Sequence, residues 1–247
     1  MLTSEIAKLR GGLIVSCQAP EGSPLCDAGI ISALALTAEQ QGAVGVRLNG
    51  ASHVAAAAPR LSVPIIGIEK VVVPGSEVYI TPTFAEASRL AESGAGLIAL
   101  DATRRARPNG ERLEELMRRI RVELGRPIMA DVATYDEGLY AADCGAEIVA
   151  TTLCGYTAET RGATLPALDL VGRLAARLSS PIICEGGVST PAELRRAFEA
   201  GAFAVVVGTA ITGVGQLVRR FAAAAPNSSQ RAPEGQSEPA SDGGDRA

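Results

Sequence analysis

The 247-residue chain lacks several features, and each absence excludes a class of protein. Its single histidine, His53, cannot form a zinc site or any other site that needs several histidines. The net charge of −4 argues against nucleic-acid binding through bulk charge. No apolar run reaches the roughly 18 residues needed to span a bilayer, and residues 1–11 are too polar for a signal peptide. These absences predict a cytoplasmic protein that binds neither nucleic acid nor membrane.

The chain also lacks a pattern of cysteine pairs, and it has few lysines. The five cysteines are odd in number and show no Cys-x-x-Cys spacing, which favours reduced thiols. Of the 23 basic residues, only Lys8 and Lys70 are lysines. An arginine cannot release its proton near neutral pH, whereas a desolvated lysine can. A lysine at position 70 of so arginine-rich a chain therefore indicates a need for a titratable amine.

Apolar runs rich in β-branched residues alternate with helical patterns along most of the chain. The expected strands are Gly12–Gln18, Ala43–Asn49, Pro64–Lys70, Gly96–Asp101, Pro127–Val132 and Glu147–Thr151, with two more inside Pro181–Gly213. The runs are continuously apolar, as strands buried on both faces require. Eight strand–helix units in a chain of this length predict one α/β domain, a (β/α)8 TIM barrel. A doubly wound open sheet is the alternative, but it would need fewer units.

The two ends of the chain differ from the repeating part. Leu2 to Arg10 predicts a short amphipathic helix, capped by Thr3 or Ser4, that suits the floor of the barrel. Residues 1–225 are expected to form the catalytic barrel domain. Residues 226–247 have no apolar periodicity and are expected to be a disordered tail.

Polar residues gather at the carboxyl ends of the expected strands, where such barrels carry their active sites. They are Gln18, Arg47, Lys70, Asp101, Asp131, Thr152 and Glu185. Because strand side chains alternate between faces, Gln18 and Glu185 should point into the barrel while Cys17 and Cys184 point outward. That orientation argues against a cysteine nucleophile.

The strand-end residues include cations and carboxylates but no cluster of histidines. This set of groups is suited to moving a proton on a carbon next to a carbonyl group. Arg47 and partial desolvation could lower the pKa of Lys70, and a closed pocket could raise that of Glu185. The alternative is a Lys70–Glu185 salt bridge that only holds the rim. Separately, backbone donors at Gly186, Gly187, Gly208 and Thr209, after the last two strands, predict a phosphate site.

Distinctive motifs follow one another from Gly12 to about Phe221. They include GGLIVSCQA, GVRLNG, PIIGIEK, EVYITPT, LIALDATRRARPNG, IMADVATYDEG, TTLCGYT and ICEGGVSTPAELRRAFEAGAFAVVVGTAIT. In this order they resemble the motifs of the N-acetylmannosamine-6-phosphate 2-epimerase family. The DATRRxRPNG and TTLxGYT patterns are specific to this family, whereas the GAFAVVVGTAIT segment that ends the last motif is of a kind shared by many phosphate-binding barrels.

The resemblance implies a cofactor-independent and metal-independent isomerase of amino-sugar and sialic acid breakdown. It would interconvert N-acetyl-D-mannosamine 6-phosphate and N-acetyl-D-glucosamine 6-phosphate by deprotonation and reprotonation at C2. By position, Lys70 matches the family's catalytic lysine and Glu185 its partner carboxylate. Gln18, Arg47 and Asp131 match residues that hold the sugar, and we expect Thr152 to bind substrate beside them. The sequence does not decide whether Glu185 donates the second proton or only assists Lys70.

Three positions depart from the family pattern. Gly213 and Gly187 stand where the family usually has arginine, and Val71 replaces an arginine after the third strand. Weaker phosphate binding is therefore expected, and a different or unphosphorylated N-acyl amino sugar stays open as the substrate.

Other functions stay open as well. A non-catalytic sugar-phosphate-binding barrel is one alternative, whereas a ribulose-phosphate 3-epimerase, which uses a histidine-held metal, is disfavoured by the single histidine. The expected partner is a small-molecule amino-sugar phosphate. Barrels of this type often form homodimers, but the sequence leaves the oligomer open.

Overall fold

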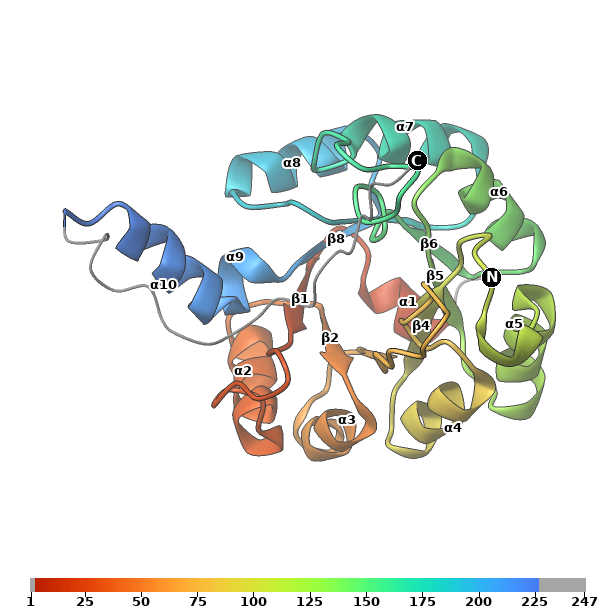
Figure 1. Ribbon diagram of the computed structural model, residues 1–247, viewed down its shortest axis with the longest axis horizontal. Coiled ribbons are helices and arrows are strands. Elements are labelled where there is room, and N and C mark those ends of the chain that lie inside the picture. The colour runs from red at the N-terminus through yellow and green to blue at the C-terminus, as the bar shows by residue number, and fades with distance from the viewer. Residues whose placement is uncertain (1–2, 227–247) are drawn as a thin grey trace, which may run out of the picture. The chain divides into compact units, whose positions relative to one another are not determined.

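Eight parallel strands close into a barrel in sequence order in the computed structural model, which describes residues 3–226 (Figure 1). β8 pairs back onto β1, with Val206 opposite Ile14. The strands are β1 (Leu13–Cys17), β2 (Gly45–Asn49), β3 (Ile65–Ile68), β4 (Leu97–Asp101), β5 (Ile128–Asp131), β6 (Ile148–Ala150), β7 (Ile182–Glu185) and β8 (Ala204–Val207). The closing pair confirms the predicted (β/α)8 barrel and rules out the doubly wound open sheet.

Helices α2 to α8 surround the strands (Figure 1). The α-helices are α1 (Ser4–Lys8), α2 (Ala28–Gln40), α3 (Ala51–Ala57), α4 (Phe84–Glu92), α5 (Leu113–Glu123), α6 (Tyr135–Asp143), α7 (Leu168–Arg177), α8 (Pro191–Glu199), α9 (Thr209–Thr212) and α10 (Val214–Ala223). Two 3-10 turns, η1 (Ala58–Arg60) and η2 (Pro108–Gly110), follow α3 and precede α5. Helices α4, α6 and α8 each begin with a Thr-x-x-Glu capping box, which fixes where the chain leaves the mouth of the barrel.

Side chains along each strand point alternately to the inside and the outside of the barrel, which produces two apolar layers. One layer fills the barrel and contains Ile14, Ile66 and Ile183, whereas the other lies between strands and helices and contains Cys17 and Cys184. The predicted outward orientation of these two cysteines is therefore confirmed. Burial raises the pKa of the Cys17 thiol to about 12 and that of Cys184 to about 11, so neither supplies a thiolate.

Helix α1 closes the amino-terminal end of the barrel, as its sequence predicted. Thr3 caps the helix, and Ile6 and Leu9 are fully buried in the inner layer. A side chain at Gly45 would begin 2.6 Å from a Leu9 methyl carbon, so Leu9 occupies the space under β2. The carboxyl end of the barrel is left as the mouth.

Between β3 and β4 only Ile66–Leu97 and Gly67–Ile98 are in register, as few pairs as between β6 and β7. Beyond these pairs the loop after β3 returns into the gap. Ile80 bridges Lys70 in antiparallel fashion, and its carbonyl accepts a 3.0 Å hydrogen bond from the Asp101 N–H. The long loop expected over Val71 to Thr81 is therefore part of the wall at the mouth.

The chain separates into two compact units after Gly213, and α10 belongs to the second unit. Taken by itself, α10 exposes Val218 and Phe221. The domain boundaries predicted at 1–225 and 226–247 remain predictions, and the predicted disordered tail lies, apart from Pro226, outside the described residues. None of the helices in residues 3–226 is long and apolar enough to cross a membrane.

Candidate active site

Arg47 is the centre of the polar network at the mouth. Its guanidinium is 1% exposed and binds Asp131 through two hydrogen bonds, of 3.0 Å from Nη1 and 2.6 Å from Nη2. Nη1 also donates a 2.6 Å hydrogen bond to Oε2 of Glu185. The planar guanidinium fork matches a carboxylate at two points, which a lysine could not do. One buried cation therefore holds two carboxylates, from β5 and β7, in place.

Thr152 completes this network. It follows β6, and its hydroxyl lies 2.6 Å from Oδ1 of Asp131 and 3.1 Å from Oε2 of Glu185. Four predicted site residues, from or just after β2, β5, β6 and β7, are thus joined by direct contacts.

The environment of Glu185 favours its protonated form. Burial raises the pKa of Glu185 to about 7, and the negative charge of Asp131 adds to the rise. Arg47 and the Thr152 hydroxyl act in the opposite direction. Two carboxylates sharing one guanidinium leave a net negative charge in a desolvated site, so one of them tends to keep a proton.

Lys70 lies just past β3 at the open mouth, where it is exposed to solvent. Its backbone N–H donates a 2.9 Å hydrogen bond to Oδ1 of Asn49, which ties the end of β3 to β2. Desolvation and the charge of Arg47 lower the pKa of Lys70, against the opposing effect of Glu185 and Asp131. In residues 3–226 no ion pair joins Lys70 to Glu185, which pairs with Arg47 instead. The rim salt bridge considered from the sequence is not formed.

Gln18 lies apart from the Arg47 network. Its amide nitrogen donates a 2.7 Å hydrogen bond to the Ser16 hydroxyl. A side chain at Gly208 would begin 3.3 Å from Cβ of Ser16, so Ser16 is the neighbour of the loop after β8. Gln18 therefore lies on the side of the mouth where the predicted phosphate site begins.

The glycine loops after β7 and β8 present backbone donors. Within the described part of the chain, the N–H groups of Gly186, Gly187, Gly208 and Thr209 donate to no acceptor. Gly186 and Gly187 have φ values of 108° and 73°, which L side chains rarely adopt. A side chain at Gly187 would also begin 2.4 Å from Cβ of Leu165. Glycine at position 187 is therefore required by the backbone and by the close approach of the loop after β6.

Two mouth residues were not singled out from the sequence. Asn49 lies two residues after Arg47 on the same strand, so alternation along β2 could have identified it. Tyr79 lies in the loop after β3, where no strand pattern indicates its direction. Asp101, by contrast, accepts hydrogen bonds from Arg105, at 2.6 Å, and from Thr103. Its carboxylate therefore holds the loop that follows β4.

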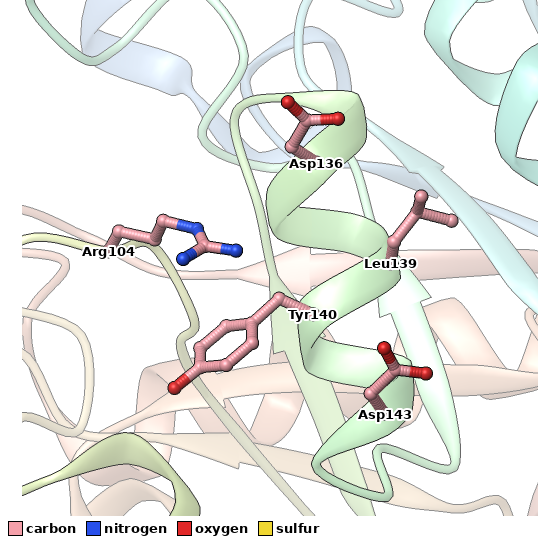
Figure 2. Close-up of a pocket in the computed structure, with 5 residues that line it drawn as sticks. All are labelled: Arg104, Asp136, Leu139, Tyr140 and Asp143. Carbon is pink, nitrogen blue, oxygen red and sulfur yellow. The ribbon is translucent and has the colours of Figure 1, made fainter.

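A cavity of about 270 Å³ lies away from the mouth, on the outer side of α6 (Figure 2). It is lined by Arg104, Asp136, Leu139, Tyr140 and Asp143. The Arg104 guanidinium stacks over the Tyr140 ring at 4.5 Å from its centre. None of the predicted site residues lines this cavity. No group of three His, Cys, Asp or Glu side chains in residues 3–226 is placed to hold a metal ion.

Fold and site together indicate a (β/α)8 barrel enzyme, with titratable groups at the carboxyl end of its strands, where such enzymes carry their active sites. The family model described as "Putative N-acetylmannosamine-6-phosphate epimerase" matches residues 31–227. The chain belongs to this family.

Similar proteins agree with that membership. The chain is 48% identical over 222 residues to a protein of Synechococcus elongatus, covering 89% of this chain and 96% of that protein. A protein of Caldanaerobacter subterraneus is 43% identical over 217 residues, covering 87% and 92%. Both carry the name "Putative N-acetylmannosamine-6-phosphate 2-epimerase". The solved N-acetylmannosamine-6-phosphate 2-epimerase of Clostridium perfringens is 39% identical, with a TM-score of 0.85 and coverage of 89% of this chain and 96% of that one.

The raised pKa of Glu185 predicts a pH-dependent stability. The unfolded carboxyl loses its proton near pH 4.5, whereas the folded protein keeps it up to about pH 7. The folded state thus binds more protons in this window, and the contribution of Glu185 to the free energy of unfolding falls as the pH rises through it. Urea unfolding of wild type and Glu185→Gln across this range should give a shallower fall in the variant.

Glu199→Gln, on the exposed surface of α8, is the control for the loss of one carboxylate. Equal pH dependence in wild type and Glu185→Gln would contradict the raised pKa.

Proposed function

We propose that this protein is an isomerase that interconverts N-acetyl-D-mannosamine 6-phosphate and N-acetyl-D-glucosamine 6-phosphate by moving a proton at C2. The observation that carries the proposal is the arrangement at the mouth, where Glu185 shares Arg47 with Asp131, while Lys70, at the end of the neighbouring β3, is left outside that ion pair. Burial raises the pKa of Glu185 to about 7, while desolvation lowers that of Lys70, which no ion pair to a described residue holds. Two titratable groups shifted toward neutrality from opposite sides are suited to act as acid and base. Membership of the epimerase family supports the choice of substrate.

The reaction begins when the sugar ring opens to its aldehyde, which acidifies the hydrogen on C2. The neutral amine of Lys70 removes that proton, and the bonding electrons move toward the C1 oxygen to form a planar enolate. The protonated carboxyl of Glu185 then delivers a proton to C2 from the opposite face. The configuration at C2 is inverted, and the reverse reaction exchanges the two roles.

Arg47, Asp131 and Gln18 are proposed to hold the sugar and its acetamido group, with Thr152 beside them. Arg47 and Thr152 each contact both carboxylates directly. A network set in advance needs little reorganisation during the reaction, which favours the transition state. All of these groups belong to the chain itself, so the proposed steps use no added cofactor.

The phosphate is proposed to bind the N–H groups of Gly186, Gly187, Gly208 and Thr209. Residues 185–191 and 208–213 contain no lysine or arginine. A charge-assisted hydrogen bond contributes about 1.5–3 kcal/mol, so a site without cations binds phosphate less tightly than one that has them. This observation favours a second candidate function, epimerisation of an unphosphorylated N-acyl amino sugar at the same Lys70.

The biological setting follows from the same proposal. The expected place is the breakdown of amino sugars and sialic acid in the cytoplasm. The oligomeric state stays open, and a homodimer, which is common among barrels of this type, is one proposal for it.

Proton NMR in D₂O tests the substrate. Wild-type protein with N-acetylmannosamine 6-phosphate should incorporate deuterium at C2 and form the gluco epimer. The unphosphorylated sugar should react more slowly, by about tenfold or more, because one charge-assisted contact is worth at least this factor. Turnover of the unphosphorylated sugar alone would transfer the assignment to the second candidate. Binding without any exchange would leave a non-catalytic sugar-phosphate binder.

Lys70→Ala should abolish exchange of the C2 hydrogen of N-acetylmannosamine 6-phosphate. A general base contributes about 10²–10⁴-fold to rate, and no other described lysine lies at the mouth. Lys8→Ala is the matched control, since Lys8 is exposed on α1 and pairs with Glu5 at 2.9 Å. Wild-type exchange in Lys70→Ala would reject the assignment of the base.

Glu185→Gln separates the two proposed steps. Glutamine keeps the size of the side chain but supplies no acidic proton, so Lys70 can still remove the C2 proton and return deuterium from the same face. Deuterium should therefore enter N-acetylmannosamine 6-phosphate while formation of the gluco epimer falls by about 10²–10⁴-fold. Loss of exchange and inversion to the same extent would indicate that Glu185 acts earlier, in ring opening or through Lys70.

A further inference from the structure

The segment from Glu69 to Thr81 forms a narrow hairpin that begins and ends in the barrel wall. The Thr81 N–H donates a 2.8 Å hydrogen bond to the Glu69 carbonyl, and the Val71 N–H donates one of 2.9 Å to the Tyr79 carbonyl. Between these two bonds Ile80 bridges Lys70. Lys70 and Tyr79 therefore lie on the two arms of one hairpin.

The base of this hairpin is held in a strained conformation. Thr81 has a φ of 45°, which is unfavourable for a β-branched residue. Its hydroxyl donates a 2.7 Å hydrogen bond to the Ala99 carbonyl and accepts one of 3.2 Å from the Glu69 N–H. Strain maintained by several bonds is common at functional sites. Here the strained residue sets the direction of the segment that carries Tyr79.

Tyr79 itself is half-buried and packs against the apolar layer inside the barrel. In residues 3–226 its hydroxyl has no hydrogen-bond partner. Burial raises the pKa of this phenol, with further increases from Asp131 and Asp101, so the hydroxyl keeps its proton. Arg47 also lies close enough for its charge to act on the phenol in the opposite direction. A protonated hydroxyl at the edge of the Arg47 network is a neutral donor without an acceptor.

The other side-chain donors of this network are bound or buried, and the Arg47 Nε–H, which has no partner in residues 3–226, is closed off from solvent. Both terminal nitrogens of Arg47 bind carboxylates, and the Thr152 hydroxyl lies between Asp131 and Glu185. Gln18 donates to Ser16. The proposed reaction nevertheless develops negative charge on an oxygen, and that charge needs a hydrogen-bond donor.

We propose that Tyr79 is a further catalytic residue, whose hydroxyl donates a hydrogen bond to the C1 oxygen of the open-chain sugar as the enolate forms. This inference rests on the proposed function, since it requires proton removal at C2. Lys70 takes the C2 proton, and the electrons of the C2–H bond form the C1–C2 double bond while the carbonyl electrons move to the C1 oxygen. The phenol keeps its own proton throughout. When C2 is protonated again, the electrons return and the hydrogen bond weakens.

Tyr79→Phe tests this role directly. The substitution keeps the ring and its packing, and it breaks no hydrogen bond to a described residue. Removing one donor from a developing oxyanion lowers kcat by about 10²–10³-fold. We expect that loss in kcat and in the rate of C2 deuterium exchange, with KM for N-acetylmannosamine 6-phosphate close to wild type and an unchanged thermal midpoint.

Tyr135→Phe is the matched control, because the Tyr135 ring lies on α6 under Arg173, 4.5 Å from the guanidinium carbon. It should retain wild-type kcat. A kcat for Tyr79→Phe within about twofold of wild type, or a rise in KM alone, would overturn the proposal. Absence of exchange in wild type would instead reject the proposed function on which it rests, so the two failures are distinguishable.

Discussion

The mouth of the barrel depends on the contact of one buried guanidinium with two carboxylates. Arg47 reaches Asp131 and Glu185 at 2.6 Å each and is almost completely withdrawn from water. An unpaired charge in such a place is strongly destabilising, so each partner requires the others. Because the three residues come from β2, β5 and β7, the contact also joins strands that are not neighbours in the barrel.

This arrangement explains why the two candidate proton-transfer groups differ. Glu185 shares its cation with Asp131 in a closed environment, and this raises the pKa of its carboxyl. Lys70 is kept outside the shared ion pair, and desolvation together with the charge of Arg47 lowers the pKa of its amine. Had Lys70 paired directly with Glu185, each group would have stabilised the charged form of the other. The structure thus separates the two candidate groups by giving the carboxylates a different partner.

The surroundings of the network are built from loops that serve distinct tasks. The hairpin after β3 lies beside β4, pairs Ile80 with Lys70 and carries Tyr79 on its returning arm. The loops after β7 and β8 offer backbone N–H groups without cationic side chains. Charge is therefore concentrated at the proposed reacting end of the site, whereas the proposed phosphate end relies on neutral donors.

The sequence by itself determined the eight strand–helix units, the outward direction of Cys17 and the position of Lys70 and Glu185 at strand ends, because these follow from local periodicity. Tertiary structure alone decided that Glu185 binds Arg47 rather than Lys70, because this choice depends on how the closed barrel brings distant strands together. It also decided that Tyr79 lies at the mouth. The gap between β3 and β4 that receives its segment arises from strand pairing, which no local pattern encodes.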